Sequence, residues 1–297
     1  MIIARLLPLL ILLATTTRSD DTAHPVTLWE IQGAHNTVYL LGSIHMLRAE
    51  DYPLPTVIES TYAKVEILIM EIDMDDLDPV ASQIAFVDAG VLQDGTTLRD
   101  LMGDALYDQA LNAAAAVDIP LDMLDKTELW YAAMMIEVML LSRIGFDPGR
   151  GVEMYLLKKA IADGKPIEGL ETLAQQIGFL DGLSIAAQRD MLLTALVDGA
   201  KIEDLMDEII LAWRHGDIDS LESSLLESFA EHKELNKVLV SDRNRRWAKH
   251  INTLLTDDDS YLIIVGALHL IGDGSVQNLL ARQGFDIRQL SEPASIR

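Results

Sequence analysis

Two kinds of hydrophobic pattern divide the chain. Short uninterrupted runs of aliphatic residues, bounded by glycine, proline or asparagine, predict buried β-strands. These runs lie at residues 27–33, 37–42, 65–73, 165–169, 261–266 and 285–290. Elsewhere apolar residues recur every three or four positions, which predicts helices over most of residues 75–163 and 172–252. Strands near both ends with helices between them predict an α/β (α+β) fold, with a central mixed β-sheet built from both chain ends and a large helical insertion.

One local pattern occurs twice. The segment YLLGSIH ends at His45 and the segment IIVGALH ends at His269, so in both an apolar run leads into Gly-x-x-His, with Gly42 and Gly266 as the glycines. In open α/β sheets the ligand crevice lies at the carboxyl ends of the strands, and glycine permits close approach of another segment. A single histidine beside a strand is more often a hydrogen-bonded core residue. Because the pattern recurs, we expect the two histidines to converge on one site.

Two carboxylates and an arginine occupy comparable positions. Glu71 lies near the end of the strand predicted at 65–73, and Glu171 directly follows the strand predicted at 165–169. Arg243 belongs to the cationic segment DRNRRW of a helix predicted over 231–252. A surface carboxylate at a strand exit and a salt-bridged surface stripe are the ordinary structural alternatives for these residues.

Two histidines and a glutamate at strand ends form a plausible open metal site, because imidazole and carboxylate together suit Zn, Mn, Co or Fe(II). We therefore predict His45, His269 and Glu71 as metal ligands, Glu171 as general base and Arg243 as the oxyanion stabiliser of a hydrolase. The roles of Glu71 and Glu171 can be exchanged on the sequence alone. In a metal-free esterase, His45 would instead act as general base oriented by Glu71, with His269 and Arg243 as electrostatic partners.

Composition narrows the choice of chemistry and partner. The 47 acidic and 23 basic residues give a net charge of −24, which repels phosphate backbones and makes nucleic acid an unsuitable partner. The chain has no cysteine, so disulfides, thiolate nucleophiles and cysteine-ligated zinc are excluded. Any metal must use histidine and carboxylate ligands. A hydrophobic content of 49% is sufficient for a sizeable core.

The first residues have the character of a secretory signal. MIIARLLPLLILLATTTRSD has one arginine, Arg5, ahead of a short apolar run, which is followed by mostly small polar residues. We expect residues 1–22 to be a signal peptide and the protein to be periplasmic or secreted, with no stable membrane span after cleavage. Residues 23–297 would then form one domain, with its sheet parts at about 26–73, 165–170 and 260–290.

The combined motifs resemble the TraB/GumN family, which includes the pheromone shutdown protein PrgY and the Tiki proteases that cleave Wnt proteins. The resemblance spans residues 26–290. It rests on LLGSIHM with the following YPLP, the strand ending in Glu71, GVEMYLLKKAIADGKPIEGLET, RNRRW, and VGALHLIGDGSVQNLLARQGFDI. Two departures from the family pattern are Asp242, where we would expect glutamate, and Leu268, where many members have glycine.

The resemblance implies an active site made of the paired GxxH motifs with a glutamate and an arginine between them. These map to Gly42, His45, Gly266, His269, Glu71 or Glu171, and Arg243. It further implies a fold like that of erythromycin esterase and the haem-binding ChaN proteins, and a metalloprotease using Mn or Co. The substrate would be a peptide or a small ester. The alternative function is non-catalytic binding of haem or another small ligand in the same cleft. The sequence gives no indication of oligomeric state.

Overall fold

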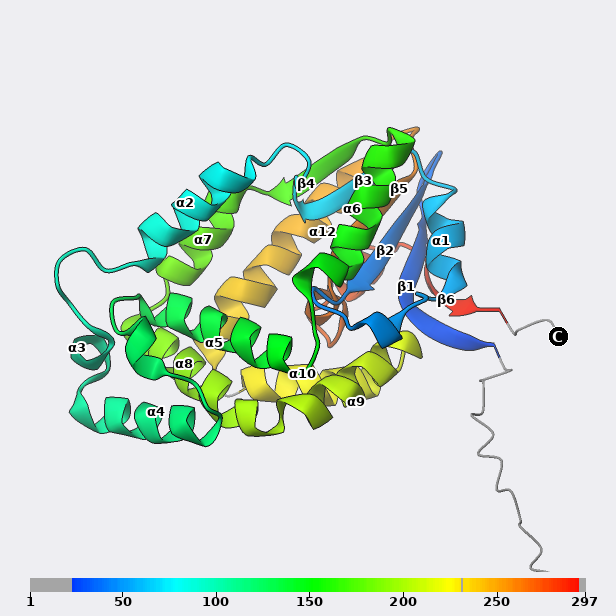
Figure 1. The fold of residues 1–297 in the computed structure, drawn as a ribbon. Coiled ribbons are helices and arrows are strands. Elements are labelled where there is room, and N and C mark those ends of the chain that lie inside the picture. Colours follow the sequence, from blue (N-terminus) through cyan, green and yellow to red (C-terminus); the bar gives the residue numbers. More distant parts are fainter. Residues whose placement is uncertain (1–22, 231, 294–297) are drawn as a thin grey trace, which may run out of the picture.

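In the part of the chain that the structure describes, six strands form one mixed sheet in the order β4-β3-β5-β2-β1-β6. The computed structural model describes residues 23–230 and 232–293, and the signal peptide predicted at 1–22 lies outside this range (Figure 1). The strands are β1 (His24–Gln32), β2 (Thr37–Ser43), β3 (Ile67–Ile72), β4 (Ile167–Glu171), β5 (Tyr261–Gly266) and β6 (Ile287–Glu292). The predicted α/β fold with a mixed sheet and extensive helices is confirmed.

The strand directions decide where the site can form. β2 and β5 are parallel neighbours, β3 pairs in parallel with both β5 and β4, and β1 is antiparallel to β2 and β6. The carboxyl ends of β2, β3, β4 and β5 therefore all lie at one edge of the sheet. This is the edge to which the recurring Gly-x-x-His motifs point.

The first two strands form a hairpin at one side of the sheet. β1 pairs antiparallel with β2 from Leu28 opposite Leu41 to Gln32 opposite Thr37. Asn36 fixes the turn, because its side-chain amide donates to the Leu254 carbonyl at 2.8 Å, which ties the hairpin to the C-terminal part of the chain.

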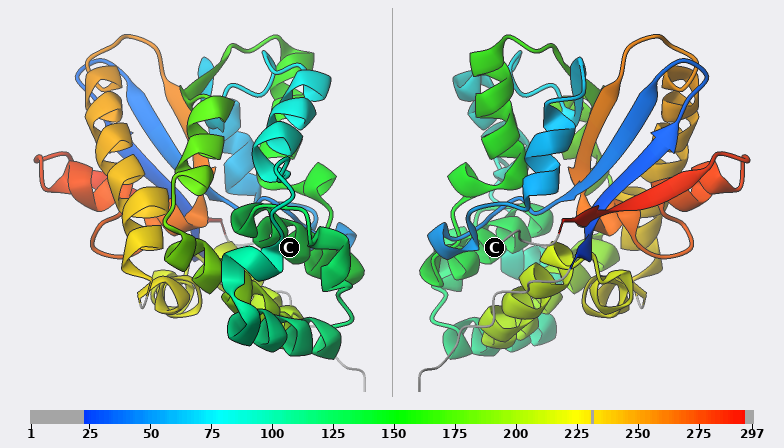
Figure 2. Two further views of the ribbon diagram at one scale, coloured as in Figure 1. Left: turned by 90° about the vertical axis from the view of Figure 1, so that its left-hand side faces the viewer. Right: turned by 90° about the vertical axis from the view of Figure 1, so that its right-hand side faces the viewer.

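Helices cover both faces of the sheet, and the apolar residues of each strand alternate between the two faces. One face packs against α1 (Thr56–Tyr62), α6 (Val152–Asp163) and α9 (Ile202–Arg214). The other packs against α12 (Asp242–Leu254) and α13 (Val276–Ala281). Figure 2 shows the sheet between these two layers.

A separate helical half extends beyond the sheet and has its own apolar core (Figure 1). Trp130, from the methionine- and aromatic-rich stretch of the sequence, is fully buried, and Leu129, Ala132, Ala133 and Ile136 beside it belong to this core. Further α-helices are α2 (Pro79–Gly90), α3 (Leu98–Met102), α4 (Asp104–Ala116), α5 (Leu129–Arg143), α7 (Leu173–Asp181), α8 (Ile185–Asp198) and α10 (Ile218–Ala230). Short 3₁₀ helices are η1 (Ala49–Asp51), η2 (Leu121–Leu124), η3 (Pro148–Arg150), η4 (Gly199–Lys201) and η6 (Ala267–Leu270).

The helix predicted over 231–252 differs from the observed structure in one respect that matters for the site. Its described part consists of α11 (Lys233–Leu235), the π-helical segment η5 (Asn236–Ser241) and α12. A π-helical turn adds a residue per turn, so it rotates the face that the following helix presents, and such turns occur often at functional sites. In this chain the turn immediately precedes Arg243.

Among the described residues, no helix is both long and apolar enough to cross a bilayer.

Candidate active site at the carboxyl edge of the sheet

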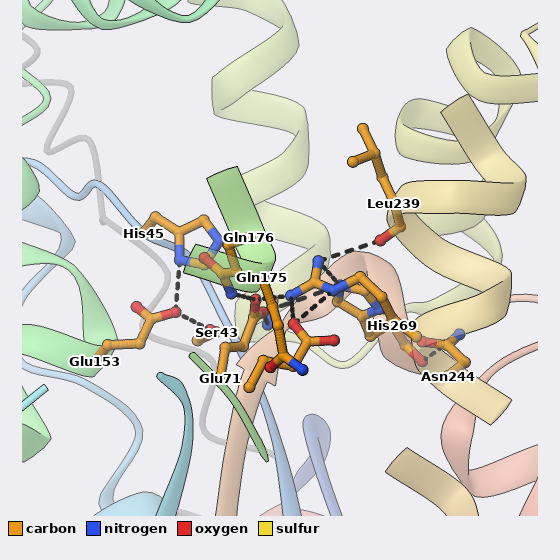
Figure 3. A network of polar contacts seen from close by, with 12 residues as sticks. Ser43, His45, Glu71, Glu153, Gln175, Gln176, Leu239, Asn244 and His269 are labelled. Atoms are coloured by element: carbon orange, nitrogen blue, oxygen red, sulfur yellow. Dashed lines mark hydrogen bonds and ion pairs between the residues drawn. The ribbon is translucent and has the colours of Figure 1, made fainter. Parts of the chain in front are cut away.

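The structure brings all the residues that the sequence singled out to the same edge of the sheet. His45 follows β2, Glu71 is the penultimate residue of β3, and Glu171 is the last residue of β4. His269 lies in η6, directly after β5, and Arg243 reaches the same place from the first turn of α12. Figure 3 shows His45 and His269 on opposite sides of Glu71.

Arg243 connects the acidic residues of the site. Its side chain is buried; Nε donates to Glu171 Oε2 at 2.9 Å, and Nη2 forms ion pairs with both Glu71 and Glu171. Nη1 donates to the Leu239 carbonyl at 3.2 Å. Arg246 binds the other oxygen of Glu171 at 3.0 Å. Both Glu171 oxygens are therefore held by guanidinium groups. This arrangement suits Glu171 better as the residue that positions Arg243 than as a proton acceptor.

The contacts of His269 define its tautomer. Nδ1 lies 2.6 Å from Asn244 Oδ1, and Nε2 lies 3.2 Å from Arg243 Nη1. Because a guanidinium can only donate hydrogen bonds, we assign Nε2 as the acceptor and Nδ1 as the protonated nitrogen. Burial lowers the pKa of His269 to about 3, so the ring is neutral at pH 7. The Trp247 ring packs against it, with ring centroids 4.4 Å apart.

His45 is anchored by a different carboxylate from the one that the metal-free alternative names. Its Nδ1 lies 2.6 Å from Glu153 Oε1 on α6, and the Ser43 hydroxyl donates to the same oxygen (Figure 3). Glu153, and not Glu71, is therefore the carboxylate bonded to His45. The Glu153 charge raises the pKa of His45 to about 9, although the His45 side chain is 67% exposed and water screens part of this effect. His45 is thus largely protonated at neutral pH in the metal-free protein.

Glu71 lies at the centre of the site as a carboxylate. The Gly266 amide donates to Oε1 at 2.8 Å, and the Gln176 side-chain amide donates to Oε2 at 3.1 Å. Burial alone would favour the neutral acid, but the charges of Arg243 and His45 and the hydrogen bond from the Gly266 amide favour the carboxylate and keep the pKa of Glu71 below its ordinary value. Since His269 is neutral, Arg243 is the nearest permanent cation that keeps Glu71 ionised.

The two motif glycines leave space where side chains meet. A Cβ added to Gly266 would lie 3.3 Å from His45 Nε2 and 3.4 Å from Glu71 Oε1, so this glycine forms the floor between the two groups. A Cβ added to Gly42 would lie 2.5 Å from the Thr27 side chain and 3.2 Å from the Ala267 backbone. Gly42 therefore allows η6, which carries His269, to lie against the end of β2.

The side chains of His45, Glu71 and His269 are of the kinds that bind a divalent cation, but their arrangement fits such an ion only in part. Each histidine has Nδ1 bonded to an orienting group, Glu153 or Asn244, which leaves Nε2 as the available donor, as in metal-binding histidines generally. However, Arg243 contacts Nε2 of His269, which itself lies 3.9 Å from Glu71 Oε1. Within residues 23–230 and 232–293, no three histidine or carboxylate side chains form a ready-made metal-binding group. The ligand assignment remains a prediction.

Three residues of the site were not singled out from the sequence: Glu153, Asn244 and Gln176. Glu153 and Asn244 are polar residues on the buried stripes of α6 and α12, which was the available signal. Buried polar residues of this kind need partners, and these two bind the two histidines. Gln176 is half-buried on α7 and gave no comparable signal.

Comparison with known proteins places the chain among relatives of both bacterial and animal origin. It is 24% identical over 247 residues to the uncharacterized protein YbaP of Escherichia coli (strain K12), covering 82% of this chain and 87% of the relative. YbaP of Shigella flexneri matches equally. A protein of Amphimedon queenslandica named as a metalloprotease TIKI homolog is 23% identical over 353 residues, covering 99% of this chain and 68% of the relative. No solved structure matches the chain. The model of the TraB/PrgY/gumN family matches residues 27–289, and the chain therefore belongs to that family.

Proposed function

We propose that this protein is a metal-dependent hydrolase that cleaves peptide bonds, with His45, Glu71 and His269 holding a divalent Mn, Co or Zn ion. One relative is named as a metalloprotease, which supports this class of activity. Such an ion, when bound, would acidify a water molecule for attack on a carbonyl carbon.

The observation that carries the proposal is the matched anchoring of the two imidazoles. Glu153 and Asn244 each bind an Nδ1 atom at 2.6 Å, from different helices on opposite faces of the sheet. A histidine that served only to fill the core would not need its second nitrogen kept available beside a carboxylate. Here the second nitrogen of each ring is kept near Glu71.

The remaining polar residues have defined tasks under this proposal. Arg243 keeps Glu71 ionised and in place, and Glu171 fixes the guanidinium from behind. To stabilise an oxyanion, Arg243 must exchange one of its present partners for the substrate oxygen. If Arg243 gives up its contact with His269, Nε2 of His269 also becomes available. Glu171 can act as general base only after release from one of its two arginines.

A metal-free esterase is less well supported. A general base must be unprotonated at working pH, whereas Glu153 raises the pKa of His45 to about 9. Haem binding is tested by the colour of the purified protein, because a visible Soret band would favour a binding protein. Export to the periplasm or outside the cell, as proposed from residues 1–22, is compatible with either function.

The decisive test is elemental analysis of the purified protein beside His45→Ala, His269→Ala and His250→Ala. His250 is an exposed residue of α12 and serves as the matched control. We expect about one equivalent of metal in the parent and the control, and a loss of at least tenfold in affinity in the other two. Peptide hydrolysis should disappear with a chelator and return with the ion. Equal metal content in all four proteins would refute the ligand assignment.

A further inference from the structure

A cavity of about 350 Å³ lies among the helices, and none of the predicted catalytic or metal-binding residues lines it. Helices α5, α8, α9 and α10 contribute to its wall, and Figure 1 shows them grouped along the lower edge of the molecule. Protein interiors are packed closely and keep few voids larger than one water molecule. The volume lies within the range of cavities that hold small organic ligands, which indicates a binding site and not a packing defect.

The wall of this cavity is mainly apolar and adaptable. Leucine, isoleucine and methionine side chains form most of it, and methionine in particular adjusts to the shape of a flexible apolar ligand. At about 30 Å³ for a water-sized group, the space suits a molecule of about ten non-hydrogen atoms. The apolar residues include Leu140, Met191, Ile202, Leu205 and Met206.

Two carboxylates also line the cavity, Glu137 on α5 and Asp198 at the end of α8. No hydrogen bond or ion pair joins either side chain to another residue that the structure describes. The other polar groups of the wall contact each other, with Thr194 Oγ1 3.4 Å from His232 Nε2. Although Glu137 is solvent-accessible, desolvation by the surrounding protein and the charge of Asp198 raise its pKa to about 7. A cation beside the two carboxylates would relieve their repulsion.

We propose that this cavity binds an apolar primary amine, with the ammonium group beside Glu137 and Asp198 and the hydrocarbon part among the leucine and methionine side chains. The described residues that line the cavity include no lysine or arginine to attract an anionic head group. A fatty acid would be repelled by the carboxylates, and a neutral alcohol would leave their charges uncompensated. This inference goes beyond the proposed function and does not depend on it.

One residue connects the cavity with the candidate active site. Leu239 lines the cavity, and its carbonyl accepts the hydrogen bond from Arg243 Nη1 at 3.2 Å. Leu239 belongs to the π-helical segment η5, which immediately precedes α12. A molecule in the cavity therefore lies against the segment that helps to hold Arg243 in place.

The test is a calorimetric titration of the full chain at pH 8 with octylamine, octanol and octanoate, which share a hydrocarbon chain and differ in charge. Glu137→Gln removes one carboxylate, and Glu203→Gln, at an exposed position on α9, is its matched control. Ala195→Leu fills apolar space from a buried position on α8, and Ala200→Leu is the control at an exposed position nearby. Circular dichroism checks that the variants fold.

We expect octylamine to bind the parent protein at least about tenfold more tightly than octanol or octanoate, because only the ammonium group compensates the carboxylates. Glu137→Gln and Ala195→Leu should each weaken octylamine binding at least about tenfold, and both controls should leave it unchanged. Equal affinities for octylamine and octanol would overturn the proposal, as would unchanged octylamine binding in Glu137→Gln or in a folded Ala195→Leu. Glu137→Gln keeps the size of an accessible side chain, so it tests the proposal even if Ala195→Leu fails to fold.

Discussion

Loss of the Arg243 cation should destabilise the protein far more than loss of a neighbouring surface charge. Arg243 is 8% exposed and contacts two carboxylates, Glu71 and Glu171, whose side chains are 15% and 3% exposed. Arg243→Met keeps an unbranched aliphatic stem and removes the guanidinium, whose Cζ lies 4.6 Å from the centroid of the Trp247 ring. The change therefore removes the charge, leaves Glu71 without its arginine partner and leaves Glu171 with Arg246 alone.

Removing one partner of a buried ion pair costs about 3–5 kcal/mol, because the remaining charge stays desolvated. For a chain of this size a loss of 1 kcal/mol lowers the melting temperature by about 2–4 °C, so we expect a decrease on the order of 10 °C. The control is Arg245→Met, in the same helical turn. The Arg245 side chain is 59% exposed and pairs with Asp242, so its loss should cost less than about 1 kcal/mol.

The assay is urea unfolding followed by circular dichroism, with the chelator present. Adding Glu71→Gln to Arg243→Met should restore part of the lost free energy, because Glu71 has lost its arginine partner whereas Glu171 still binds Arg246. The reasoning is refuted if Arg243→Met and Arg245→Met unfold at the same urea concentration. It is also refuted if the double variant is less stable than Arg243→Met alone, with no part of the lost free energy restored.

Two further predictions concern the histidine end of the site. The raised pKa of His45 contributes to the free energy of unfolding a part that is fully present below pH 6.5 and is lost as the pH rises towards 9. Because the ring is mostly exposed, we expect this part to be about 1 kcal/mol, and we expect Glu153→Gln to lack it. The same pH dependence of unfolding in the parent protein and in Glu153→Gln would contradict this prediction. Gly266→Ala should place a methyl group against His45 Nε2 and Glu71 Oε1 and reduce metal affinity, with little change in melting temperature; calorimetric titration with Mn²⁺ measures this, and unchanged affinity would show that the ion binds elsewhere.

Much of the fold and the centre of the site could be predicted from local sequence, because strand runs and the residues that follow them are encoded within a few positions. His45, Glu71, Glu171 and His269 were found in this way, since the ends of parallel strands meet at one edge. Arg243 was found from its unusual cationic surroundings in an acidic chain. Their pairing was not predictable, because it depends on how far each helix reaches over the edge.

The partners of the histidines show this limit most clearly. Glu153 reaches His45 because α6 lies across one face of the sheet, and Asn244 reaches His269 because α12 lies across the other. Neither relation follows from spacing along the chain. Likewise, the binding of Glu171 by both Arg243 and Arg246 depends on the three-dimensional placement of α12 and does not follow from local sequence.

The central position of β5 has a consequence for how the molecule is made. This strand, residues 261–266, lies between β2 and β3, which are synthesised about 200 residues earlier. Until it emerges from the ribosome, the earlier strands can form only the pairs β1–β2 and β3–β4, and two-stranded ribbons of this kind are marginally stable in water. The central sheet can therefore be completed only after β5 has been synthesised, and the histidine pocket closes only at that stage.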